Sequence, residues 1–197
     1  MSGTANIITE VFFLKNMNTS CCVRLIRKVL SDAGLEAGYI RMGEVSVSWN
    51  AEKYSSEDLK ALFTDNGFPV ITNKEEQLVE KIKSAVIELI HYSDNKSSII
   101  RNSDYLVDKT GYSYQHLSAV FSQHTSMTLE KFIIHHKIEK VKELIESDEM
   151  TLSEIAWQMG YSSVQYLSAQ FKKIAGVTVS EYKNLGMHSR RPLDDIA

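Results

Sequence analysis

Two stretches in the second half of the sequence repeat one pattern, and this duplication constrains the fold more than any other feature. An offset of 49 aligns Gly111-Tyr112-Ser113 with Gly160-Tyr161-Ser162. An offset of 50 then aligns Leu117-Ser118-Ala119 with Leu167-Ser168-Ala169, so the later copy has one extra turn residue. The same offset pairs three further positions: Phe121 with Phe171, Thr128 with Thr178, and Phe132 with Tyr182. The chain therefore contains two related units.

The later copy carries the start and stop signals of three helices. Thr151 and Glu154 form a predicted capping box, and Gly160 is a predicted C-terminal cap. Gly176 ends the next helix, and Thr178 with Glu181 caps a third. Apolar residues share one side of each of the first two helices: Leu152, Ile155, Ala156 and Met159, then Leu167, Phe171 and Ile174. Helix, short turn with glycine, helix is the helix-turn-helix arrangement, whose second helix enters the DNA major groove.

An amphipathic helix over Leu129–Glu146 is predicted to join the two units. A helix of that length spans about 27 Å at a rise of ~1.5 Å per residue. Successive major-groove faces of DNA lie ~34 Å apart, a spacing that the helix reaches with the width of its flanking units. The geometry suits one protein reading two turns of one DNA face.

Residues 78–184 resemble the tandem helix-turn-helix domain of AraC/XylS-type bacterial transcription regulators. The resemblance rests on LSEIAWQMGYSS, YLSAQFKK, Gly176 and VSEYK. It implies a sequence-specific DNA-binding transcription regulator. The chain departs from the family where Lys137 replaces a common arginine of the linker helix. Ala119 and Ala169 likewise stand where related regulators often carry an arginine, so guanine reading at those points is in doubt.

The predicted DNA contacts follow from this resemblance and from the chemistry of base edges. Glutamine pairs bidentately with adenine, and an apolar side chain contacts the thymine methyl group. The candidates for base contacts are Tyr114, Gln115 and Ser118 in the first unit, and Val164, Gln165 and Ser168 in the second. The candidates for phosphate contacts are Ser113, Ser162, Ser163, Lys172 and Lys173. A plain solvated helix surface is the alternative reading of the glutamines.

The first seventy residues predict a separate domain with the order βαββαβ, which is the ferredoxin-like plan. The expected strands are residues 7–14, 37–41, 44–49 and 68–71, and the expected helices cover 20–33 and the stretch that starts at Ser55. Pro69 is most easily accommodated if the last strand lies at an edge. The whole chain is thus predicted to be α+β, with a sheet domain followed by an all-α domain.

This first domain resembles heavy-metal-associated domains, which carry Gly-Met-x-Cys-x-x-Cys between the first strand and the first helix. Here the stretch reads Asn16-Met17-Asn18-Thr19-Ser20-Cys21-Cys22, so Thr19 stands where the first cysteine belongs. A soft metal ion needs converging thiolates. Met17, Cys21 and Cys22 are therefore weak metal candidates, and no metal or other cofactor is expected. A fold kept for packing or partner contact is favoured over metal binding, with a small-molecule or redox role open.

We expect domains at residues 1–72 and 78–184, a linker at 73–77 and a flexible tail at 185–197. Among the 197 residues there is no apolar run long enough to cross a membrane, no basic-apolar leader, and one adjacent pair of cysteines, which together predict a cytoplasmic protein. The chain lacks a phosphate-binding glycine loop and a nucleophile elbow, and its six histidines form no pair at i, i+4 spacing, so an enzyme is not expected.

Duplex DNA is the expected partner, with RNA polymerase and a second copy of the chain as further candidates. The formal net charge of −3 argues mildly against nonspecific nucleic-acid binding, which depends on Lys and Arg at phosphates. The alternative function is a metal- or protein-binding module whose helical domain has lost DNA affinity. The duplicated motif favours DNA binding over that alternative.

Overall fold

The fold is that of a computed structural model, which describes residues 6–92, 102–184 and 190–196. The Cα positions divide into two compact units between Ser84 and Ala85, inside the helix α3 (Lys74–Ile87). Because α3 begins at Lys74, the linker predicted at residues 73–77 is mostly helical. Asn73 explains the start of the helix at Lys74, because its side-chain oxygen accepts the backbone N–H of Glu75 at 2.8 Å and of Glu76 at 3.3 Å.

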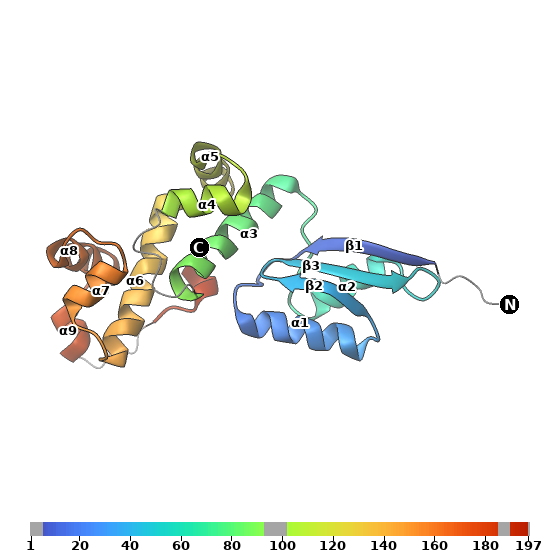
Figure 1. The fold of residues 1–197 in the computed structure, drawn as a ribbon, viewed down its shortest axis with the longest axis horizontal. Helices are drawn as coiled ribbons and strands as arrows, with labels where there is room; N and C mark the ends of the chain where they lie inside the picture. Colours follow the sequence, from blue (N-terminus) through green and yellow to red (C-terminus); the bar gives the residue numbers. More distant parts are fainter. Residues whose placement is uncertain (1–5, 93–101, 185–189, 197) are drawn as a thin grey trace. The chain divides into compact units, whose positions relative to one another are not determined.

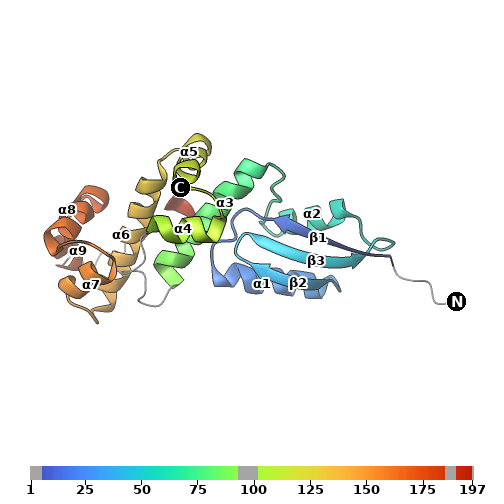
Figure 2. The ribbon, with the colours of Figure 1, turned by 45° about the horizontal axis from the view of Figure 1, so that its top comes forward.

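The N-terminal unit is a three-stranded antiparallel sheet with two helices (Figure 2). Its elements, in chain order, are β1 (Ile7–Phe13), α1 (Ser20–Asp32), β2 (Glu36–Arg41), β3 (Glu44–Asn50) and α2 (Ser56–Asp65). The strands lie in the order β1-β3-β2. The predicted strands and helices of residues 7–65 are thereby confirmed, with ends shifted by a residue or two.

Alternation along the strands builds the core of this unit. Val45, Val47 and Trp49 share one face of β3, and Phe12 of β1 lies opposite Val45 in the register. The helices bury their apolar stripes in the same core, including Ile26, Leu30, Leu59 and Phe63. The other sheet face is mixed: the hydroxyls of Thr9 and Ser48 lie 2.8 Å apart, and the apolar side chains of Ile7 and Val11 are exposed beside them.

The fourth strand, predicted at residues 68–71, does not form as a strand. A single bridge pairs Leu14 with Val70, and two flanking hydrogen bonds run from Lys15 N–H to the Pro69 carbonyl and from Ile71 N–H to the Phe13 carbonyl. Because Pro69 has no N–H to donate, the ladder stays short. The observed order of strands and helices is therefore βαββα followed by a bridged segment.

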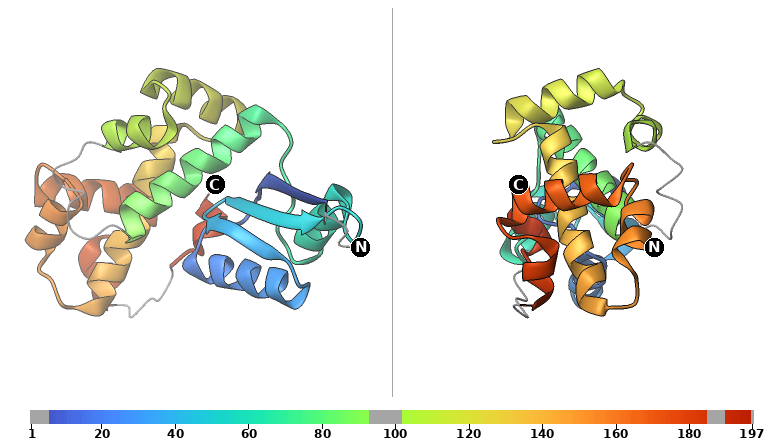
Figure 3. Two further views of the ribbon diagram at one scale, coloured as in Figure 1. Left: turned by 45° about the vertical axis from the view of Figure 1, so that its right-hand side comes forward. Right: turned by 90° about the vertical axis from the view of Figure 1, so that its left-hand side faces the viewer.

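The C-terminal unit consists of helices around the long helix α6 (Figures 1 and 3). After α3 a π-helix covers Glu88–Tyr92. The later elements are α4 (Asn102–Thr110), α5 (Tyr114–His124), α6 (Leu129–Ser147), α7 (Leu152–Gln158), α8 (Val164–Ala175), α9 (Val179–Asn184) and a 3-10 helix (Leu193–Ile196). No helix in the described ranges has the length and apolarity needed to span a bilayer.

The sequence repeat is also a structural repeat. Phe121 packs on Phe132 with ring centroids 5.0 Å apart, and the equivalent pair, Phe171 and Tyr182, lies 5.4 Å apart. Thr128 caps α6 and the equivalent Thr178 caps α9 by accepting the backbone N–H three residues on. Each unit therefore closes its core with an aromatic pair and begins the next helix with the same threonine cap.

The tail predicted as flexible beyond residue 184 is partly packed. Within residues 190–196, the Arg190 guanidinium donates to Glu143 at 2.9 Å and the Arg191 N–H donates to Glu139 at 3.0 Å. Ile196 is 2% exposed. The tail thus contacts α6 and encloses the Glu139 carboxylate, whose other oxygen pairs with Lys142 at 2.7 Å.

Candidate nucleic-acid interface

The helices α5 and α8 begin in the same way. Ser113 caps α5 and Ser163 caps α8, each with a side-chain oxygen that accepts the backbone N–H three residues on. Gly111 and Gly160 precede these caps with φ of +78° and +68°, a backbone that favours glycine. Because Ser163 matches Ser113, the extra residue of the second unit lies in the turn between its two helices.

The six base-contact candidates fall into three equivalent pairs. Gln115 and Gln165 are each the second residue of their helix and are exposed. Neither glutamine amide has a hydrogen-bond partner among the described residues. The other candidates are half-buried in both units: Tyr114 with Val164, and Ser118 with Ser168. The two helices therefore present one free amide each, at the same helical position.

The phosphate candidates separate into two groups. The hydroxyl oxygens of Ser113 and Ser163 cap α5 and α8, so they already accept hydrogen bonds from the helix backbone. Ser162, Lys172 and Lys173 are exposed. The two lysines lie in the last turn of α8, where a positive charge interacts favourably with the helix dipole.

The structure adds an exposed aromatic residue that the sequence analysis left out. Tyr166 is the third residue of α8, is 52% exposed, and accepts a hydrogen bond from the Gln170 amide at 3.1 Å. Its position between Gln165 and Leu167 in the first turn was the available signal.

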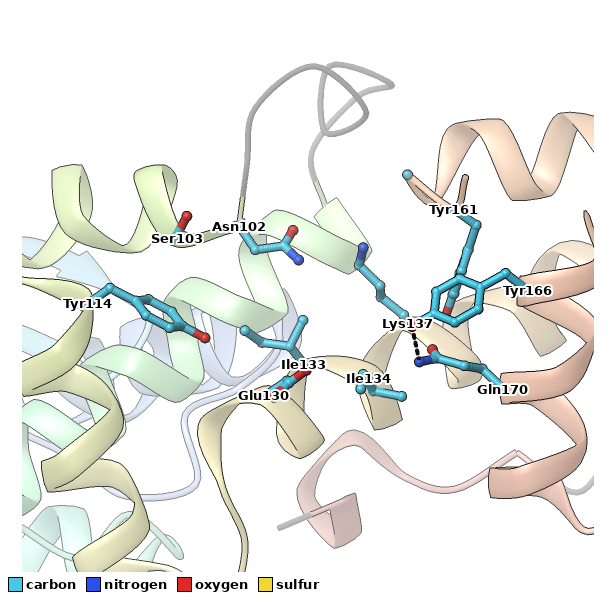
Figure 4. A pocket seen from close by; sticks show the side chains of 11 residues that line it. Asn102, Ser103, Tyr114, Glu130, Ile133, Ile134, Lys137, Tyr161, Tyr166 and Gln170 are labelled. Carbon is cyan, nitrogen blue, oxygen red and sulfur yellow. Dashed lines mark hydrogen bonds between the residues drawn. The ribbon is translucent and has the colours of Figure 1, made fainter. Parts of the chain in front are cut away.

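A pocket of about 480 Å³ lies over the middle of α6, within the C-terminal unit (Figure 4). Its walls come from α4, α5, α6, α8 and the turn before α8: Asn102, Ser103, Tyr114, Glu130, Ile133, Ile134, Lys137, Gly160, Tyr161, Tyr166 and Gln170. Burial raises the pKa of Tyr114, and Glu130 adds to that shift. Burial also raises the pKa of Tyr161, whose buried hydroxyl has no hydrogen-bond partner within the described residues. The pocket combines polar and apolar side chains and stands between the two candidate recognition helices, α5 and α8.

A family model described as a helix-turn-helix domain matches residues 106–185. That stretch of the chain is a helix-turn-helix domain. The match starts inside α4 and reaches one residue past α9, so it contains both α5 and α8. The expected AraC-type domain is thereby supported over the part of the chain that contains the repeat.

Two proteins illustrate the likeness in sequence. The xylose operon regulatory protein of Escherichia coli K12 is 32% identical over 101 residues, which is 51% of this chain and 26% of that protein. The F1 operon positive regulatory protein of Yersinia pestis is 28% identical over 109 residues, 55% of this chain and 36% of that protein. This chain therefore matches about a quarter to a third of the length of these regulators.

Among solved structures, the C-terminal domain of AraT, a response regulator from Geobacillus stearothermophilus, is 23% identical. The match covers 61% of this chain and 94% of that domain, with a TM-score of 0.47.

Two histidines that are 45 residues apart meet inside the unit that contains the helix-turn-helix domain. The ring nitrogens Nε2 of His91 and Nδ1 of His136 lie 3.2 Å apart. Burial lowers the pKa of His91 to about 4 and that of His136 to about 3, so both rings are neutral at pH 7. No cluster of three or more metal-ligating side chains occurs in the described ranges, and His188 lies outside them. The pair is a packed internal contact that i, i+4 spacing could not reveal.

The metal candidates of the N-terminal unit are separated by their surroundings. Met17 is 1% exposed and belongs to the core. Thr19 caps α1, and its Oγ1 lies 3.2 Å from the Cys22 sulfur, which is half-buried. Cys21 is exposed, and its sulfur accepts a hydrogen bond from Arg24 at 3.2 Å. Positions 19 and 22 therefore face each other, as the resemblance implies for a pair of thiolates, while Cys21 faces solvent.

Proposed function

We propose that this protein is a transcription regulator that binds specific duplex DNA through α5 and α8 in successive major grooves. The observation that carries the proposal is the equivalent placement of Gln115 and Gln165, each exposed, second in its helix and without a hydrogen-bond partner among the described residues. A glutamine there can read adenine through two hydrogen bonds. RNA polymerase and a second copy of the chain are proposed as further partners, and the bacterial cytoplasm as the place of action.

The two glutamines give a paired test of this function. A preferred site is first selected from random DNA with the full chain. Gln115→Ala and Gln165→Ala should each cost about 1–3 kcal/mol on that site and relax base choice at one position. The two relaxed positions should lie about 10 base pairs apart, because the two helices read adjacent turns. The measurement is a titration of each variant against single-base variants of the site.

The salt dependence of DNA affinity distinguishes the proposed regulator from the alternative, an interaction module without DNA affinity. Affinity for the selected site should fall as salt rises, since lysines release counterions from phosphates. Absence of salt-dependent binding to any selected pool would support the protein-interaction alternative instead. Equal losses of Gln115→Ala and Gln165→Ala on all sequences would show that the amides do not read bases.

We also propose that residues 6–71 form a shortened ferredoxin-like domain of the heavy-metal-associated type that has lost one metal ligand. The order β1-β3-β2, with residue 70 bridged to the outer side of β1, supports this plan. The proximity of Thr19 Oγ1 to the Cys22 sulfur supports the loss of a ligand at position 19.

Thr19→Cys should create tight Cu(I) binding by the monomer, because two sulfurs would then converge at positions 19 and 22. The helix should lose about 1 kcal/mol of stability with its cap. The measurement is competition of the full chain against a Cu(I) chelator. Ser20→Cys is the matched control, since it adds a thiol at an exposed neighbouring position without creating the 19–22 pair. Tight binding by the unmodified monomer would contradict the lost-ligand interpretation.

A further inference from the structure

Lys137 is a half-buried cation that pairs with no carboxylate of the described residues. Its ammonium donates to the Met159 carbonyl at 2.8 Å and lies 5.5 Å from the centre of the Tyr161 ring. No ion pair within the described ranges includes it, and burial alone lowers its pKa. By contrast, Lys140 and Lys142 on the same helix each meet a glutamate three residues away. A desolvated cation of this kind favours an anion from outside the chain.

The pocket around Lys137 supplies further hydrogen-bond donors. An ammonium has three donors, and the Met159 carbonyl uses one of them. Figure 4 shows the Asn102 amide and the Lys137 ammonium directed into the same space. The hydroxyls of Tyr114 and Tyr166 line the two sides. Glu130, the acidic residue in the lining, precedes Lys137 by two turns of α6, which separates the two residues by about 10 Å along the helix axis.

We infer that this pocket binds one phosphate group of the DNA backbone that passes between the two reading helices. The inference rests on the proposed function. Lys137 is the ninth of the 19 residues of α6, the helix that joins the two units. If α5 and α8 occupy successive major grooves, the backbone between those grooves passes the middle of α6. A phosphate there would receive charge-assisted hydrogen bonds from Lys137 and Asn102.

Such a contact would also link DNA binding to the placement of the second unit. The Met159 carbonyl, which Lys137 binds, lies at the end of α7, directly before Gly160 and the turn into α8. A phosphate on Lys137 therefore connects the backbone of the DNA to the turn that positions α8.

The test replaces single phosphates of the selected site with neutral methylphosphonates. The full chain is titrated as wild type, Lys137→Gln and Asn102→Ala. At one phosphate between the two half-sites, neutralisation should weaken wild-type binding about tenfold. It should leave the affinity of Lys137→Gln nearly unchanged, because the cation is already gone. Lys137→Gln should also lower the slope of log affinity against log salt by about 0.9.

Two further variants keep the test decisive. Lys140→Gln removes a lysine from α6 outside the pocket lining and should retain the full sensitivity to that phosphate. Asn102→Ala leaves the hydrogen bond from Lys137 to the Met159 carbonyl intact. It should show a coupling to the same phosphate that is weaker than the coupling shown by Lys137→Gln.

Additive losses at every phosphate would overturn the inference while leaving the proposed function intact. Stabilisation by inorganic phosphate that needs Lys137, without coupling to any DNA phosphate, would assign the pocket to a free anion and overturn it as well. Failure of the wild type to bind any selected DNA would overturn the function and the inference together.

Discussion

Replacement of Phe171 by alanine is expected to lower the free energy of unfolding by about 3–5 kcal/mol, since it leaves a cavity in a closed core. Phe171 is 0% exposed, and its ring packs on Tyr182 at 5.4 Å between centroids. The loss is measured by urea denaturation of the full chain, followed by helical circular dichroism. Because Phe171 holds α8 in place, DNA affinity should fall as the folded fraction falls.

Trp157→Ala is the matched control for this cavity. Trp157 is larger than Phe171 and belongs to α7 of the same unit, yet it is 66% exposed. Its removal should change the unfolding free energy by about 0.5 kcal/mol or less. Equal costs for the two variants would contradict the assignment of Phe171, rather than Trp157, to the core.

Lys142→Met is expected to cost about 3–5 kcal/mol, because it leaves the Glu139 carboxylate buried without its cation. Glu139 is 4% exposed and Lys142 is 5% exposed, with 2.7 Å between the paired atoms. The Arg191 N–H would remain as a donor to Glu139. The free energy of unfolding from urea titration at pH 7 measures the loss.

The double variant Glu139→Gln, Lys142→Met should recover most of that stability. It removes both charges, and the glutamine oxygen can still accept the Arg191 N–H. A double-mutant cycle gives the coupling energy of the pair. A double variant as unstable as Lys142→Met alone would mean that the lysine acts through packing, for example against the Tyr182 ring at 5.9 Å.

Local signals in the sequence were sufficient for most helices and strands. The capping boxes at Ser55, Thr151 and Thr178 each close on an acidic side chain three residues later, as side-chain reach requires. Gly111 and Gly160 occupy the positive φ that their turns need. Such signals act over a few residues, so a single sequence contains them completely. Asn73 carried the same kind of signal, and the linker prediction missed it.

Because the unit occurs twice, the sequence indicated side-chain packing as well as local structure. Because Phe121 and Phe171 are equivalent in sequence, so are their partners Phe132 and Tyr182, and the structure pairs each with its own. The same equivalence places Gln115 and Gln165 at one helical position. The base-contact candidates therefore came from the sequence, while their role in DNA binding stays a proposal.

Contacts between distant residues were decided only by the tertiary structure. The pair of His91 with His136, the enclosure of Glu139 by residues 190–196 and the pocket over Lys137 join segments that no periodicity relates. The segment at residues 68–71 had the composition of a strand, yet Pro69 limits its pairing with β1 to one bridge. The sequence by itself determined the helices of the second helix-turn-helix unit, the long helix that joins the two units and the duplication of the unit, because caps, glycines and periods are local. Burial and charge compensation depend on neighbours in space, so the absence of an ion pair at Lys137 within the described residues emerged only from the folded chain.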